Sequence, residues 1–79
     1  MEKKRMQRIT VQSKANVAVA ESIGIIKSEN NDGWLIWLER GGKRAFVCGI
    51  DGPIVYEDMA KARRFIRRFR PDLALGPTI

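Results

Sequence analysis

The sequence predicts a small single α+β domain. In it, an antiparallel sheet of three to four strands packs against a C-terminal amphipathic basic helix, and a second helix lies near the N-terminus. Three observations predict this class. The chain has 79 residues, 44% of them hydrophobic, which suffices for one small core. Turn residues separate short β-type runs over residues 25–56. Apolar residues then recur at helical spacing over residues 57–69.

The N-terminal region is expected to begin with a flexible basic arm. Residues 1–8 carry four basic side chains and no apolar pattern, so the folded domain is placed at residues 9–79. Residues 9–11 alternate and predict a short strand. Ser13 is a suitable N-cap for a helix over residues 14–23, with Gly24 near its C-cap. A strand over residues 16–20 is the competing interpretation.

The middle of the chain is predicted to form a meander of strands. Residues 25–28 and 34–40 are β-type runs separated by an Asn-Asn-Asp-Gly turn. The Gly41-Gly42 pair supplies a second turn, which leads to a third strand over residues 43–50. Asp51-Gly52-Pro53 makes a further turn before the β-type residues 54–56. The apolar tail, residues 73–79, would suit an edge strand.

The clearest predicted helix spans residues 57–69. Apolar side chains recur on one of its faces and basic side chains on the other. Glu57 and Asp58 lie in the first turn and arginines in the last turn, as the helix dipole favours. Pro71 cannot continue the helix and disfavours helical geometry at Arg70, so the helix is expected to end there.

The composition argues against an enzyme and against a metal or cofactor site. The chain has no histidine and one cysteine, which excludes Ser-His and Cys-His nucleophile pairs and the usual zinc ligand sets. The acidic residues Asp51, Glu57 and Asp58 are explained by a turn and a helix start. Cys48 is expected to be a small buried apolar residue, and a lone cysteine fits a reducing compartment, the cytoplasm. No apolar run is long enough for a membrane span.

The basic helix is the strongest functional signal. Six of the ten residues from 61 to 70 are Lys or Arg, in a chain of net charge +6, and none of the ten is acidic. The guanidinium fork suits phosphate and carboxylate groups, so this face is a candidate for binding a nucleic-acid backbone or an acidic protein. A merely solvated face is the alternative. The candidate binding residues are Lys61, Arg64, Arg67, Arg68, Lys43, Arg44 and Trp37.

Two tryptophans on one predicted strand add a second candidate. Trp34 and Trp37 are three residues apart, so they point to opposite faces of the sheet. If helices cover only one face, Trp37 with Arg44 or Lys43 would form an exposed platform for bases or for a protein. Burial of both tryptophans is the alternative, because the chain has little other core.

The order helix, three strands, helix resembles the double-stranded-RNA-binding domain, and Met59-Ala60-Lys61-Ala62-Arg63 is loosely similar to the basic start of that family's second helix. The family's glycine-rich lead-in and loop histidine are missing. The meander containing Trp34 and Lys43-Arg44, followed by a helix, also resembles the small DNA-binding domains of tyrosine recombinases, which read DNA with the sheet. The two resemblances imply different modes of binding, and neither assigns the chain to a family.

Two functions follow as hypotheses. The first is a non-enzymatic module that engages nucleic-acid phosphates, DNA or RNA, through the basic helix, helped by Lys43, Arg44 and the N-terminal arm. The second is a small protein-binding adaptor or inhibitor, of the phage or plasmid accessory type, that docks on an acidic or nucleic-acid-binding surface of a host complex.

Overall fold

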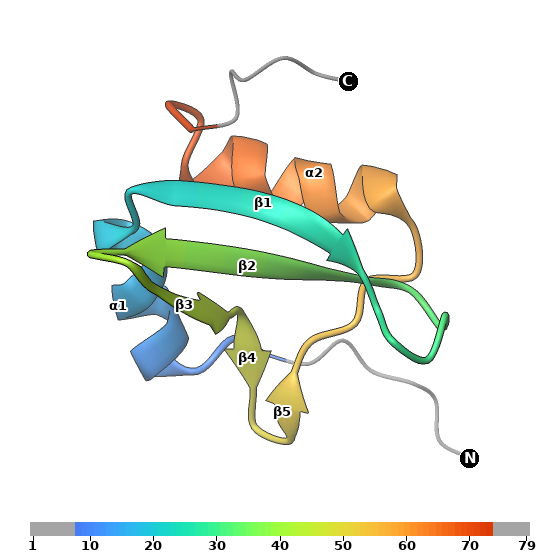
Figure 1. Ribbon diagram of the computed structural model, residues 1–79. Helices are drawn as coiled ribbons and strands as arrows, with labels where there is room; N and C mark the ends of the chain where they lie inside the picture. The colour runs from blue at the N-terminus through green and yellow to red at the C-terminus, as the bar shows by residue number, and fades with distance from the viewer. Residues whose placement is uncertain (1–7, 74–79) are drawn as a thin grey trace.

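The computed structural model describes residues 8–73 and has the predicted α+β class (Figure 1). Two helices accompany a three-stranded antiparallel sheet, ordered β1-β2-β3, and a separate two-stranded sheet, β4-β5. The elements in chain order are α1 (Val11–Val19), β1 (Ser22–Lys27), β2 (Trp34–Arg40), β3 (Lys43–Phe46), β4 (Cys48–Gly49), β5 (Gly52–Pro53) and α2 (Met59–Phe69).

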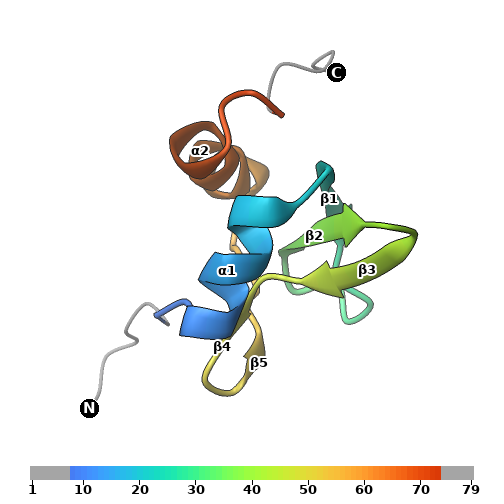
Figure 2. The ribbon, with the colours of Figure 1, turned by 90° about the vertical axis from the view of Figure 1, so that its left-hand side faces the viewer.

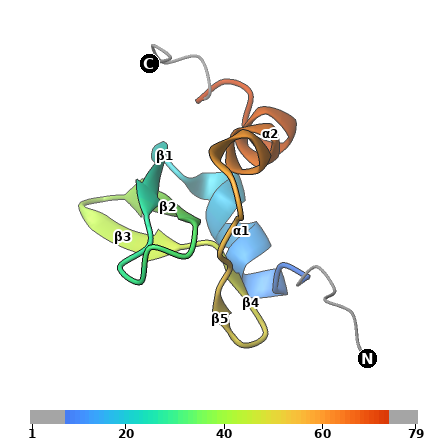
Figure 3. The ribbon, with the colours of Figure 1, turned by 90° about the vertical axis from the view of Figure 1, so that its right-hand side faces the viewer.

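Both helices lie on the same side of the three-stranded sheet, and no described element covers the other side, called the open face below (Figures 2 and 3). Strand residues alternate between the faces, so Ile36 and Leu38 of β2 point toward the helices and are almost fully buried. The core consists of Val17, Ala20, Ile36, Leu38, Val47, Ile54, Ala62, Phe65 and Ile66. Every layer of the fold contributes to this one cluster, which sets how α2 sits on the sheet.

The predicted turn between β2 and β3 is confirmed. Arg40 pairs with Lys43 across a two-residue loop. Gly41 and Gly42 in that loop have φ values of 58° and 83°, the left-handed conformations of a type I′ hairpin that glycine adopts without strain. The turn before β2 also contains a left-handed residue, Asn31, with φ of 61°.

The predicted strand over residues 43–50 is broken, and the run 54–56 is not a strand. Val47 is fully buried between β3 and β4, where it donates to the carbonyl of Ile36 (2.9 Å) and accepts from Ile54 (3.0 Å). This inward turn directs β4 away from the first sheet. Tyr56 forms only an isolated bridge with Trp34, through two hydrogen bonds of 2.8 Å. The meander therefore forms three strands in one sheet and a separate small hairpin.

The prediction for the N-terminal helix was right in kind and wrong in position. The helix begins at Val11 instead of Lys14, because Thr10 is the N-cap: its Oγ1 accepts from the backbone N–H of Ser13 (3.1 Å). Ser13 is buried and accepts from the backbone N–H of Cys48 (2.8 Å). Gly24 is not a C-cap but a residue of β1, paired with Trp37.

The two strands predicted near this helix do not form. Residues 9–11 contribute one isolated bridge, between Ile9 and Gly49, before the helix starts. Residues 16–20 lie in α1 and its C-cap, so the competing strand interpretation is also wrong. In the helix, Val17 and Val19 are about 200° apart around the axis. Val17 therefore lies in the core, whereas Val19 is 47% exposed.

Helix α2 starts and ends close to the predicted residues. Asp58 is the N-cap, and its Oδ1 accepts from the backbone N–H of Lys61 (3.0 Å). Arg70 is the C-cap, directly before Pro71. The predicted basic arm and the predicted edge strand at the C-terminus fall mostly on residues 1–7 and 74–79, outside the described residues, and Leu73 lies in a turn.

Candidate functional site

The exposed side of α2 is the most strongly charged surface of the described chain. The buried residues of α2 are Ala62, Phe65 and Ile66, which lie on the side that faces the core. At about 100° per residue, the cations occupy an arc of about 160° around the opposite side. All five of these cations are exposed: Lys61, Arg63, Arg64, Arg67 and Arg68. Arg63 was left out of the predicted site, although it belongs to the same basic run of sequence.

The described residues give these arginines no acidic ion-pair partner. Lys61 faces Glu57 at 3.7 Å, one turn earlier, in an exposed ion pair. Asp58 is engaged in capping the helix. Within residues 8–73, the four arginines at positions 63, 64, 67 and 68 form no ion pair, and the guanidinium of Arg68 lies 5.6 Å from the ring centre of Phe69. Their charge faces solvent.

The net charge of the described chain is concentrated on this helix. Residues 57–70 contain six cations and two carboxylates. The other described residues, 8–56 and 71–73, contain six of each, so they are neutral in sum. The positive field of the described domain therefore arises from one helix and not from a uniformly basic surface.

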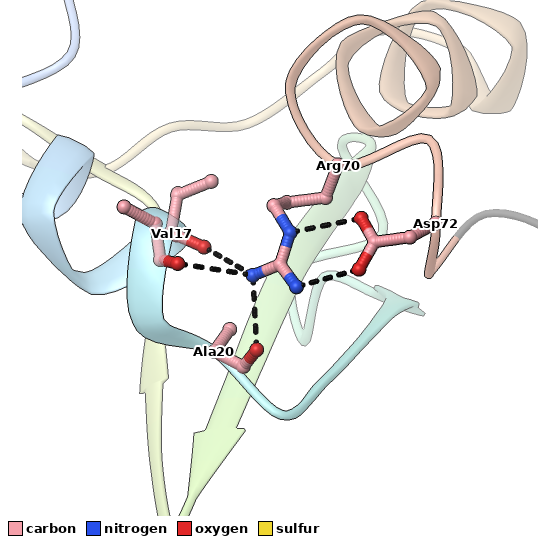
Figure 4. Close-up of polar contacts among 5 residues, drawn as sticks. Val17, Ala20, Arg70 and Asp72 are labelled. Carbon is pink, nitrogen blue, oxygen red and sulfur yellow. Dashed lines mark hydrogen bonds and ion pairs between the residues drawn. The ribbon is translucent and has the colours of Figure 1, made fainter.

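Arg70 belongs to the same basic run but has a structural role (Figure 4). Its guanidinium donates to the carbonyls of Val17 (2.9 Å), Ala18 (3.3 Å) and Ala20 (2.9 Å), at the C-terminal end of α1. It also forms a two-bond pair with Asp72, at 3.0 and 2.7 Å. These contacts give the Ala18 and Ala20 carbonyls a donor at the end of α1, and give the Val17 carbonyl a second donor beside the backbone N–H of Ala20 (3.3 Å). They tie α1 to the end of α2.

The ion pair between Arg70 and Asp72 shifts the pKa of both side chains. Its hydrogen bonds hold the pKa of the Asp72 carboxyl below the usual range and raise the pKa of Arg70 further. The Arg70 side chain is 19% exposed, whereas the arginines of the candidate site face solvent. Arg70 is therefore not available to a ligand in the way that the other arginines are.

The remaining predicted site residues lie on the sheet, not on α2. Trp37 points to the open face, and the guanidinium of Arg44 lies 4.4 Å from its ring centre. Of the two cations predicted beside Trp37, Arg44 is therefore the one on its face. Lys43 precedes Arg44 on β3 and therefore points to the other face. The seven predicted residues consequently do not form one surface, because the sheet separates Trp37 and Arg44 from α2.

The two tryptophans point to opposite faces, as predicted, and both are half-buried. Trp34 lies on the helix side of β2, and the Nζ of Lys27 lies 4.7 Å from its ring centre. Trp37 covers Gly24 of β1, where a Cβ would overlap the indole ring. Cys48 is also half-buried and is a free cysteine.

Comparisons with protein-family models, with curated proteins and with solved structures find no match for this chain. Residues 8–73 contain no group of His, Cys, Asp and Glu side chains that could hold a metal ion. None of the described helices is long and apolar enough to cross a membrane.

Proposed function

We propose that the protein is a non-enzymatic module that binds nucleic acid through the phosphates, with α2 as the binding element, in a reducing compartment such as the cytoplasm. The observation that carries the proposal is made on residues 8–73: four solvent-facing arginines form no ion pair there, and they lie on the one described element that holds excess positive charge. A solubilising helix face usually interleaves both signs of charge, and this face does not.

The arrangement of the cations suits a polyanion. Side chains three and four positions apart on a helix are about 5–6 Å apart, so Arg64, Arg67 and Arg68 form a continuous cationic surface. The guanidinium groups are planar and hold phosphate oxygens with two hydrogen bonds each. Because no carboxylate among residues 8–73 pairs with these arginines, binding a phosphate does not require an ion pair within that range to be broken.

The binding residues of the proposal are Lys61, Arg63, Arg64, Arg67 and Arg68. Lys43 and Arg44 are not needed for it, because they lie on the sheet in a region whose charges balance. Contact with phosphates alone carries no sequence information, so we expect binding to many sequences with similar affinity.

A salt titration tests this proposal. Fluorescence anisotropy of labelled single- and double-stranded DNA and RNA should give affinities that fall with salt, with a log-log slope of about −4, which corresponds to four or five phosphates. Between 50 and 200 mM salt this is a loss of roughly two orders of magnitude. An affinity that does not change with salt would contradict the proposal.

The second candidate uses the same arginines on an acidic protein surface. Failure to bind any of the four nucleic acids at 50 mM salt, with a stoichiometric protein complex recovered from nuclease-treated lysate, would support this adaptor function. Recovery of nucleic acid alone would count against it.

A further inference from the structure

The open face of the three-stranded sheet is apolar, and no described element covers it (Figures 2 and 3). Directly opposed residues in antiparallel strands share a face, so the register defines its rows. One row is Ile26 and Leu35. The next is Gly24, Trp37 and Phe46, and the last is Ser22, Glu39 and Arg44.

Large apolar side chains on this face are accessible. Ile26 is 46% exposed and Phe46 is 38% exposed. Leu35 is half-buried, and so is Trp37, whose ring centre lies 4.4 Å from the guanidinium of Arg44. This surface is contiguous, and it has aromatic side chains at its centre and charged side chains at one end. Its composition is typical of a protein interaction site.

The charge of this face points to a neutral partner. Glu39 and Arg44 are direct cross-strand neighbours, and within residues 8–73 neither forms an ion pair. Their charges cancel, so the face does not attract a polyanion as α2 does. A partner that fits it must present apolar side chains, one cation and one anion in matching places.

The same face of a second copy meets these requirements. A twofold axis that runs along the strands, between β2 and β3, exchanges β2 with β3 across the interface. This axis brings Trp37 against the partner's Phe46, and Glu39 against the partner's Arg44. Each contact occurs twice, as a closed isologous interface requires. We propose that the protein forms a homodimer by packing these two open sheet faces together.

The area that the two copies bury sets the expected affinity of the dimer. The axis overlays β2 and β3 of the two copies, a surface about 10 Å wide and at most about 23 Å long, the length of β2, so each copy contributes about 200 Å². A standard interface buries about 800 Å² per partner. The dimer is therefore weak and concentration-dependent, with a dissociation constant of about 10–1000 µM.

Sedimentation velocity of the full chain, from about 5 µM to 1 mM, tests the proposal. The expected result is a reversible shift from monomer to dimer, with Phe46→Glu raising the dissociation constant at least tenfold. Ile50→Glu is the matched control, because Ile50 is 83% exposed in the turn between β4 and β5, away from this face. This control should dimerise as the native chain does.

Exchanging the charges of Glu39 and Arg44 distinguishes a loss of dimerisation from a loss of folding. Glu39→Arg and Arg44→Glu each place like charges at the end of the face, so each variant alone should be weakened at least tenfold. An equimolar mixture of the two should form a heterodimer with the native affinity restored to within about threefold. Folding of each variant is checked by circular dichroism.

Three results would overturn the proposal. One is a native chain that stays monomeric at 1 mM, and another is a mixture that does not associate better than its components. The third is quenching of tryptophan fluorescence by a single-stranded oligonucleotide that Phe46→Glu abolishes, which would assign the face to bases instead. The first two measurements contain no nucleic acid and are therefore independent of phosphate binding by α2.

Discussion

At the scale of single residues, Arg70 shows that neighbouring arginines in one sequence run have different roles. Its guanidinium binds three carbonyls at the end of α1 and the Asp72 carboxylate, whereas Arg67 and Arg68 in the same turn face solvent. The sequence offers one hint of this difference. Arg70 precedes Pro71, where the helix must end, so its side chain is at the position from which a C-cap can reach other elements.

The Asp72 carboxyl makes the stability of this junction depend on pH. Its pKa is lowered in the folded chain from an ordinary value of 3.8 by the hydrogen bonds from Arg70. The stabilisation is therefore fully present above pH 4 and is lost as the pH falls below that value toward the folded pKa. We expect Asp72→Asn to lower the urea midpoint at pH 7 and to reduce its difference from the native chain at pH 3. Equal differences at both pH values would contradict this role.

Tyr56 gives a pH effect of opposite sign at the alkaline end. It is the one tyrosine of the chain, and burial raises its pKa to about 12. Because the folded pKa is above the ordinary value of 10, stability is retained below pH 10 and falls as the pH rises from 10 to 12. Absorbance of tyrosinate should titrate near pH 12 in the native chain and near 10 in urea. Native titration near 10 would show that Tyr56 is open to solvent.

At the scale of elements, Ser13 fixes α1 to β4, although its residue type and position predict an N-cap. Ser13 accepts the backbone N–H of Cys48 and so joins α1 to β4, while Thr10 caps the helix. We expect Ser13→Ala to lower the free energy of unfolding by about 1–3 kcal/mol, because the Cys48 N–H loses its partner. Thr10→Ala should cost about 1 kcal/mol. Urea denaturation measures both, and a neutral Ser13→Ala would contradict the role of Ser13.

The charged face of α2 is expected to cost the free protein stability. Arg63 with Arg67 and Arg64 with Arg68 are like charges one turn apart, a destabilising arrangement of about 0.2–0.5 kcal/mol per pair. Arg64→Gln with Arg67→Gln removes one member of each pair. This double variant should be more stable than the native chain by about 0.5 kcal/mol at low salt, and the gain should shrink in 0.5 M salt. A loss of stability would mean that these arginines support the fold.

At the scale of the whole molecule, the sequence predicts the layers better than the boundaries. The α+β class, the β2–β3 turn and the extent of α2 follow from local signals: glycine pairs, alternation and a proline. The shift of α1 and the break at Val47 do not, because both depend on tertiary contacts. Both Thr10 and Ser13 are suitable N-caps by residue type, and in the structure Thr10 caps the helix while Ser13 contacts Cys48.

Local sequence signals likewise predict part of the candidate site, and the rest depends on tertiary structure. Helical periodicity identifies the exposed cations of α2, and strand alternation separates Trp34 from Trp37. Sequence cannot show that the sheet separates Trp37 and Arg44 from α2, since that depends on which face the helices cover. The balance of charge outside residues 57–70 becomes informative only when α2 is known to be one exposed surface.

The most direct test of phosphate binding by α2 compares two double variants with the same change in net charge. Arg64→Glu with Arg67→Glu alters the helix, whereas Lys14→Glu with Arg40→Glu alters exposed residues of α1 and β2, outside α2. Both take the net charge from +6 to +2. Anisotropy with labelled duplex DNA and single-stranded RNA at 50 mM salt should show at least a 100-fold loss for the α2 variant and less than fivefold for the control. Equal losses in both variants would contradict the assignment of binding to α2.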